Sequence, residues 1–289
     1  MVTLENNFLK VSIRSQGAEI TSIVNKSTVT EHMWQADEAI WPWHAPNLFP
    51  IVGGCLNNEI HVDGKSFTLG RHGFARSTEF VEGDVKPTHA KFTLTYNENT
   101  LEVYPYKFTF QVLYDLIDNK LRVSYKVINN DDKTIYFSVG AHPAFNVPFF
   151  KNEVLEDYFL EFEKEEILET HLLSENGLFN GEKEIVPAYA NRLPLTNDLF
   201  AKDALVFKNL KSREIAIKSK NHEHSLSVKY PHFDYMGLWA KPGASFVCIE
   251  PWLGCADSEG KALDIKEKEA INALEHGHVF EVDFTIQLS

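Results

Sequence analysis

The sequence predicts an all-β protein, a large antiparallel β-sandwich with a few short helices. Apolar and polar residues alternate with period two in segments along the whole chain, turn signals separate these segments, and none of the helical patterns is long enough for a crossover helix. Such alternation is typical of antiparallel sheets with one face buried and one in water. Sandwiches of 289 residues often form one domain, so we expect a single domain over residues 1–289.

The first half of the chain contains two strong hairpin signals. Asp63-Gly64 separates two short alternating runs within residues 59–69, and a second turn at 118–119 joins the longer runs 108–116 and 121–127. Residues 91–96 and 134–139 have strand composition as well. We therefore expect antiparallel neighbours here rather than parallel strands.

The second half continues the same pattern. Strands are expected at 214–219, 225–230, 236–240, 246–252 and 279–288. Helix signals are weak and short, at residues 168–178 and 266–274. The sequence lacks the GxGxxG and GxxxxGK[ST] motifs, so a nucleotide-binding α/β fold is disfavoured.

Composition excludes several classes of protein. The content of 44% apolar and 24% charged residues is typical of soluble globular proteins, and the net charge of −13 disfavours a nucleic-acid partner. No run of about 18 apolar residues predicts a membrane span, and no secretory signal is visible. Three cysteines without a CxxC motif indicate reduced thiols, so we expect a cytoplasmic protein.

The most unusual side chain is Glu250, in the apolar stretch FVCIEPW. Phe246, Cys248 and Glu250 fall on one face of the expected strand, and a carboxylate among such neighbours is costly unless it is paired or used. A salt bridge to Lys241 or Arg76 is the simpler explanation. A base at the edge of a cleft is the functional one.

Two histidines also stand at positions that favour chemistry. His142 follows an apolar strand and precedes a proline that keeps its backbone extended, which orients it for proton transfer or for a plain carbonyl hydrogen bond. His72 begins the HGFAR stretch, where Gly73 permits a sharp turn that presents His72 and Arg76, at a surface turn or at a site.

Asp203 interrupts the apolar run LFAKDALVF and either caps a loop or binds a ligand. Together with Glu250 it could serve glycoside hydrolysis, but that reaction gives the histidines no clear role. Opening a sugar ring needs a base for the anomeric hydroxyl and an acid for the ring oxygen, which Glu250 and His142 would supply. We expect no metal site, because the pairs His222/His224 and His276/His278 lack a nearby third ligand.

In the order NLFPIVGG, HGFAR, GAHPAFNVP, KDALVF, GLWAKPG and CIEPW, the chain resembles the aldose 1-epimerase (galactose mutarotase-like) superfamily. The similarity runs from about Leu4 to Leu288 and is greatest to the branch found in bacterial lactose and galactose gene clusters. It implies a galactose mutarotase-like supersandwich with an open cleft for a monosaccharide, and no cofactor.

By motif position, the resemblance implies catalytic roles for Glu250 as general base and His142 as general acid, with His72 and Asp203 binding the sugar. Relatives usually carry an arginine where this chain reads Gly53-Gly54-Cys55, and Arg71 or Arg76 are candidates to replace it in binding.

The expected function is therefore interconversion of the α and β anomers of a free aldohexose such as galactose or glucose. HGFAR also resembles the glucose-6-phosphate 1-epimerase branch, so a hexose-6-phosphate epimerase is one alternative, with Arg71 and Arg76 binding the phosphate. A non-catalytic carbohydrate-binding protein is the other. A monomer or a homodimer formed by exposed strands, such as the C-terminal one, fits the sequence.

Overall fold

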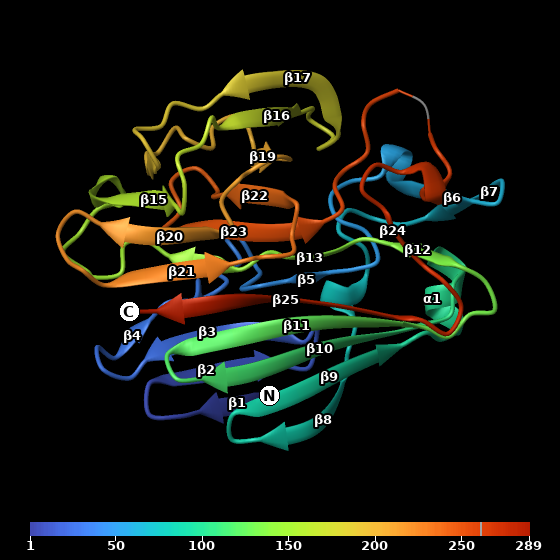
Figure 1. Cartoon of the computed structure of the whole chain (residues 1–289), viewed down its shortest axis with the longest axis horizontal. Coiled ribbons are helices and arrows are strands. Elements are labelled where there is room, and N and C mark those ends of the chain that lie inside the picture. Colours follow the sequence, from blue (N-terminus) through green and yellow to red (C-terminus); the bar gives the residue numbers. More distant parts are fainter. Residues whose placement is uncertain (261) are drawn as a thin grey trace.

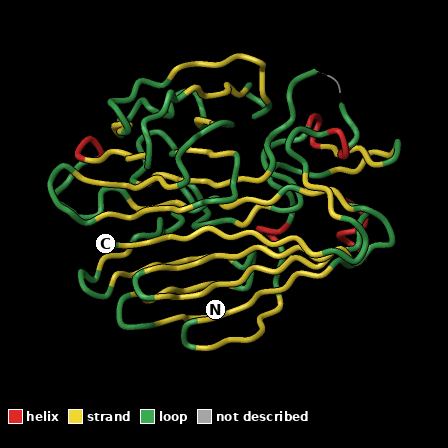
Figure 2. Tube along the Cα trace, viewed as in Figure 1, coloured by secondary structure: helices red, strands yellow, loops and turns green. Residues whose placement is uncertain are grey.

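The computed structural model describes residues 1–260 and 262–289, and most of them lie in strands (Figure 1, Figure 2). Every ladder between the named strands is antiparallel. The predicted all-β sandwich is therefore confirmed. No helix among the described residues has both the length and the apolar character needed to cross a membrane.

The largest sheet has nine strands and carries no residue of the candidate site. In sheet order its strands are β18 (Arg192–Pro194), β15 (Tyr158–Phe162), β20 (Glu214–Ser219), β21 (Ser225–Lys229), β25 (Val279–Leu288), β11 (Lys120–Asn129), β10 (Phe108–Ile117), β9 (His89–Thr95) and β8 (Val81–Lys86).

An eight-stranded sheet carries the candidate site. Its main path is β17 (Phe179–Ile185), β16 (Glu169–Leu173), β19 (Leu205–Phe207), β22 (Tyr235–Trp239), β23 (Phe246–Leu253), β13 (Val139–Ala141) and β5 (Asn47–Leu48), and β14 (Ala144–Asn146) also pairs with β23.

Smaller elements complete the fold. They are a four-stranded sheet, β1 (Val2–Glu5), β2 (Leu9–Arg14), β3 (Glu19–Asn25) and β4 (Thr30–Glu31); the pairs β6 (Glu59–Val62) with β7 (Lys65–Thr68) and β12 (Ile135–Phe137) with β24 (Asn272–Leu274); helix α1 (Glu98–Val103); and 3₁₀ turns at Leu56–Asn58, Ala75–Ser77, Leu155–Asp157 and Ile265–Glu267.

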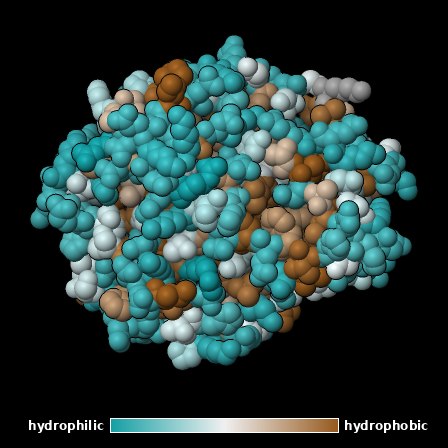
Figure 3. Space-filling view, viewed as in Figure 1, coloured by the Kyte–Doolittle hydropathy of each residue, from teal (hydrophilic) through white to brown (hydrophobic). Residues whose placement is uncertain are grey.

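The hairpin of β10 and β11 shows why alternation predicted this fold. Phe110 pairs with Val127 and Tyr114 with Val123, and all four side chains are buried, while the intervening residues point outward. A single core contains buried residues from the nine-, eight- and four-stranded sheets. Figure 3 shows the matching surface, on which hydrophilic residues cover most of the visible face and apolar ones gather toward its centre.

Three sequence-based expectations are wrong. The segment 168–178 contains strand β16 instead of a helix, and the segment 266–274 contains the end of a 3₁₀ turn followed by strand β24, which pairs with β12. Tertiary strand pairing overrides weak helix propensity in both segments. The C-terminal strand β25 lies between β21 and β11, so it is no free edge for a dimer.

Candidate active site

Strand β23 places Glu250 in the middle of the eight-stranded sheet. It pairs with β22 on one side and with β13 and β14 on the other, and Glu250 itself lies opposite Gly237. The expected strand is confirmed, and Glu250 is only 1% exposed. A carboxylate in this position needs a partner or a function.

His142 provides the nearest partner. It follows β13, donates its backbone N–H to Pro46 O (3.1 Å), and places Nε2 3.3 Å from Oε2 of Glu250. Neither expected cation pairs with Glu250, because Lys241 donates to Ile40 O at 2.8 Å and Arg76 donates to a backbone carbonyl. The structure thus brings together the two residues with the predicted acid and base roles.

Burial changes the protonation of both groups. It raises the pKa of Glu250 well above its usual value, and the charge of Asp203 adds to this rise. Burial, with the charge of Arg76, lowers the pKa of His142 to about 3. Because the two groups interact, they titrate as a pair, and the pair holds one proton between the lowered pKa of His142 and the raised pKa of Glu250.

His72 has its tautomer fixed by the backbone. The backbone N–H of His72 donates to Gly53 O (2.9 Å), and the backbone N–H of Gly53 donates to Nδ1 of the His72 ring (3.1 Å). The neutral ring must therefore carry its proton on Nε2, where it can donate to a ligand. Burial lowers the pKa of His72 well below its usual value, with His142 and the arginines contributing, so the ring is neutral.

The turn that presents His72 requires glycine. Gly73 has φ +69°, and a Cβ there would lie 2.3 Å from Phe49 O. The same carbonyl accepts from the N–H groups of Phe74 and Ala75, which closes the turn. This explains the glycine of the HGFAR motif physically.

The two arginines line the same cleft. Arg71 donates to Asn176 O at 2.9 Å, and Arg76 donates to Arg71 O at 3.1 Å while its guanidinium lies 5.2 Å from the centre of the Trp43 ring. Within the described part of the chain, neither arginine forms an ion pair with a carboxylate. Their positive charge is therefore available to a ligand.

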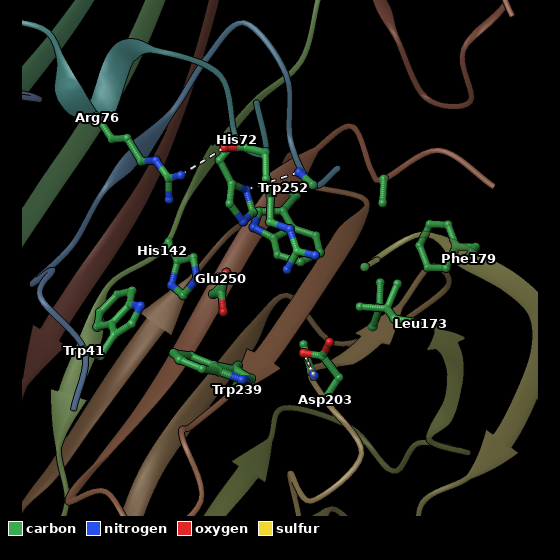
Figure 4. A pocket seen from close by; sticks show the side chains of 16 residues that line it. Trp41, His72, Arg76, His142, Leu173, Phe179, Asp203, Trp239, Glu250 and Trp252 are labelled. Carbon is green, nitrogen blue, oxygen red and sulfur yellow. Dashed lines mark hydrogen bonds and ion pairs between the residues drawn. The ribbon is translucent and has the colours of Figure 1, made fainter. Parts of the chain in front are cut away.

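Asp203 stands across the cleft from His142 and Glu250 (Figure 4). It precedes β19, and its Oδ1 accepts the N–H of Ala204 at 2.7 Å, so the expected loop cap is real. Its side chain still lines the cavity, beside Leu173 and Phe179.

Three tryptophans complete the site. Trp41 stacks on His142 with ring centres 5.0 Å apart, and Trp239 meets the same imidazole edge-on at 5.8 Å. Trp252 lines the cavity as well. The sequence analysis did not assign these residues to the site. The aromatic-rich stretch WPWH, which contains Trp41, was the available signal for one of them.

The cavity measures about 200 Å³ and is lined by all six predicted site residues, which are Glu250, His142, His72, Asp203, Arg71 and Arg76. This volume is below the about 300–1,000 Å³ of typical drug-sized pockets. Three buried polar atoms in its wall lack hydrogen-bond partners: His142 Nδ1, Glu250 Oε2 and Trp252 Nε1. Together these features fit a small ligand rich in hydroxyl groups.

One group of described residues has the spacing of a metal site. His142, Cys248 and Glu250 each offer a ligand atom, and these atoms lie within 4.8 Å of one another. Burial raises the pKa of the Cys248 thiol well above its usual value, which disfavours the thiolate that binds metals. Cys55, Cys248 and Cys255 are all free and buried, so the predicted thiols are confirmed.

Comparisons with known proteins show the family of the chain. The sequence profile of the aldose 1-epimerase family matches residues 1–260. The chromosomal LacX protein of Lactococcus lactis is 35% identical over 278 residues, covering 92% of each chain.

Two solved structures have the same fold. A galactose mutarotase related enzyme from Lactobacillus acidophilus superimposes with a TM-score of 0.94 and 34% identity, covering 99% of this chain and 96% of the other. A galactose mutarotase-like protein from Lactobacillus casei gives a TM-score of 0.94 and 33% identity over the full length of both chains. The chain belongs to the aldose 1-epimerase family.

Proposed function

We propose that the protein is a mutarotase that interconverts the α and β anomers of a free aldohexose, with galactose or glucose as substrate. The observation that carries this proposal is the 3.3 Å contact between Glu250 and His142, buried in the wall of a small polar cavity. Binding a sugar needs hydrogen bonds, whereas an acid and a base in direct contact suit proton transfer to and from a sugar ring.

The reaction uses the single proton of the pair. In the ion-pair form, ionised Glu250 removes the proton from the C1 hydroxyl while protonated His142 gives its proton to the ring oxygen. The C1–O5 bond breaks as the C1=O1 bond forms. Rotation about C1–C2 and reversal of both transfers give the other anomer, and both residues regain their starting protonation.

The environment of the pair supports this cycle. After ring opening both residues are neutral, which is the form that burial favours. The open-chain state is therefore stabilised relative to the closed ring beside the ion pair, which lowers the barrier to ring opening. In a solvated site, water would stabilise the ion pair, and the two proton transfers that open the ring would be less favourable.

The surrounding residues orient the sugar. His72 donates from Nε2, Asp203 accepts hydroxyl protons, and Trp41 and Trp239 hold the imidazole of His142 in place. A Cβ at Gly54, where the family resemblance implies an arginine, would lie 3.5–3.6 Å from the carbonyl oxygens of the 176–177 turn, and Arg71 reaches the same turn to donate to Asn176 O. We infer that Arg71 replaces the missing arginine in binding a hydroxyl group.

The test is the rate of anomerisation of freshly dissolved α-galactose and α-glucose, followed by polarimetry with and without the protein. The proposal predicts acceleration that scales with protein concentration and disappears in Glu250→Gln. An unaccelerated reaction of both sugars would contradict it. Calorimetric binding without acceleration would point to the carbohydrate-binding alternative.

The unpaired arginines favour one second candidate, a hexose-6-phosphate 1-epimerase. Guanidinium groups bind phosphate in a bidentate manner, and neither Arg71 nor Arg76 forms an ion pair with a described carboxylate. The parallel assay uses α-glucose-6-phosphate. A kcat/KM at least tenfold above that for both free sugars would replace the first proposal with this one.

A further inference from the structure

The indole of Trp252 packs directly against the backbone of the two strands that flank β23. Trp252 follows Glu250 by two residues on β23, so both project from one face, and Trp252 pairs with Gly140 while Glu250 pairs with Gly237. A Cβ at Gly140 would lie 2.6 Å from Cδ1 of the indole, and one at Gly237 would lie 2.5 Å from Cζ2. The glycines on both flanking strands thus make room for the ring beside Glu250.

The ring also carries an unsatisfied donor. Trp252 is 6% exposed and its Nε1 has no hydrogen-bond partner. Oε2 of Glu250 lies 3.3 Å from His142 Nε2 but accepts no hydrogen bond either. An unsatisfied buried N–H costs about 1–3 kcal/mol, and phenylalanine would fill a similar space without this cost. A donor and an acceptor, both unsatisfied, therefore stand on one strand face at the site.

We propose that Trp252 is a positioning residue whose indole N–H closes on the carboxylate of Glu250 when that carboxylate is ionised. This inference rests on the proposed mutarotase function. The N–H stabilises the charged carboxylate more than the neutral carboxyl group, so it favours the ion-pair form that starts the reaction.

The other groups around Glu250 do not perform this task. The titratable side chains that line the cavity or share the strand face are Cys248, His142, Asp203, His72, Arg71 and Arg76. His142 must give up its proton during the reaction, and the charge of Asp203 opposes ionisation of Glu250. Both arginines donate to backbone carbonyls instead. Trp252 is thus a donor that keeps its proton throughout the cycle.

Removing this N–H has a distinctive effect on the pH profile. The ionised form of Glu250 becomes less favourable, so the active ion pair is less populated at every pH and kcat falls. The pair also keeps its single proton to higher pH, so the alkaline limb of the pH profile of kcat shifts to higher pH. A tryptophan that served only as a wall of the cavity would change KM and leave this limb in place.

The experiment compares Trp252→Phe with the matched variant Trp239→Phe, which removes a different indole from the cavity lining. The expected result for Trp252→Phe is a kcat lower by about 10- to 100-fold, little change in KM, and an alkaline limb about one pH unit higher. Trp239→Phe is expected to raise KM and keep the wild-type limb. A wild-type kcat and limb in Trp252→Phe would overturn the inference.

A second variant tests the same contact without changing the indole. Gly237→Ala would push the ring away from its place, so kcat should fall and the alkaline limb should rise in the same direction. Thermal unfolding of each variant identifies loss of fold. If the wild-type protein has no activity on any sugar, the proposed function fails. If it is active and the limb stays in place in both variants, only this inference fails.

Discussion

Strands β10 and β23 show how differently two strands of one sandwich can be used. In β10 every second residue, from Phe108 to Leu116, is buried in the core and the others face outward. In β23 both faces are covered: Val247 and Ile249 lie in the core, while Glu250 and Trp252 line the cavity. The first strand buries only apolar side chains, which stabilises the fold. The second also buries charged and polar groups that the proposed reaction needs, which lowers the stability of the fold.

The largest effect should come from the acid–base pair on the β23 side of this comparison. Replacing His142 with Asn should lower kcat by about 10²–10⁴-fold, because the ring oxygen loses its proton donor. The double variant with Glu250→Gln should be nearly as active as the worse single variant, since the pair acts as one unit. Steady-state polarimetry of the three variants checks this. Multiplicative losses would contradict a shared proton.

A substitution in β10 should have the opposite profile. Phe110 stacks on Phe49 with ring centres 4.5 Å apart and is fully buried, so Phe110→Ala should lower the free energy of unfolding by about 3–5 kcal/mol. The kcat of the folded protein should not change, because Phe110 does not line the cavity. Denaturant unfolding measures the change in stability, and a kcat corrected for the folded fraction of the protein measures the change in activity. A loss of kcat in fully folded protein would break the comparison.

These contrasts also explain what the sequence could predict. Alternation places Phe110 and Val127 in a core without knowledge of the partner strand, and it placed Glu250 on the face of Phe246 and Cys248. The WPWH stretch was a local signal for Trp41, but it does not predict where that loop packs. The position of the Trp252 indole depends on glycines in two other strands. The helix predicted at residues 266–274 is wrong because the pairing of β24 with β12 is a long-range effect that the local sequence does not show.

The same burial that serves chemistry should cost stability. Folding raises the pKa of Glu250, so the folded state binds more protons and its stability falls as pH rises from 4.5 through the raised pKa. Glutamine has no charge to lose. Glu250→Gln should therefore unfold like the wild type below pH 4.5 and be more stable by about 1–3 kcal/mol at alkaline pH. Denaturant titrations at both pH values measure this. An equal or lower stability at alkaline pH would contradict the buried-charge explanation.

The smallest effect is expected at the rim of the cavity. Arg71 is exposed, so Arg71→Met should raise KM for the free sugar by about tenfold or less and leave kcat unchanged. Lys10→Met, on the outward face of β2, provides a matched loss of charge and should change neither parameter. A fall in kcat with constant KM would assign Arg71 to the chemical step instead.

The central claim is that one proton, shared by Glu250 and His142, passes between the pair and a sugar ring. Magnetisation-exchange NMR of the anomeric protons in equilibrated galactose measures this interconversion directly, without net turnover. The account predicts fast α–β exchange with the wild-type protein and only the uncatalysed rate with Glu250→Gln. Exchange at the wild-type rate in the folded Gln variant would contradict it.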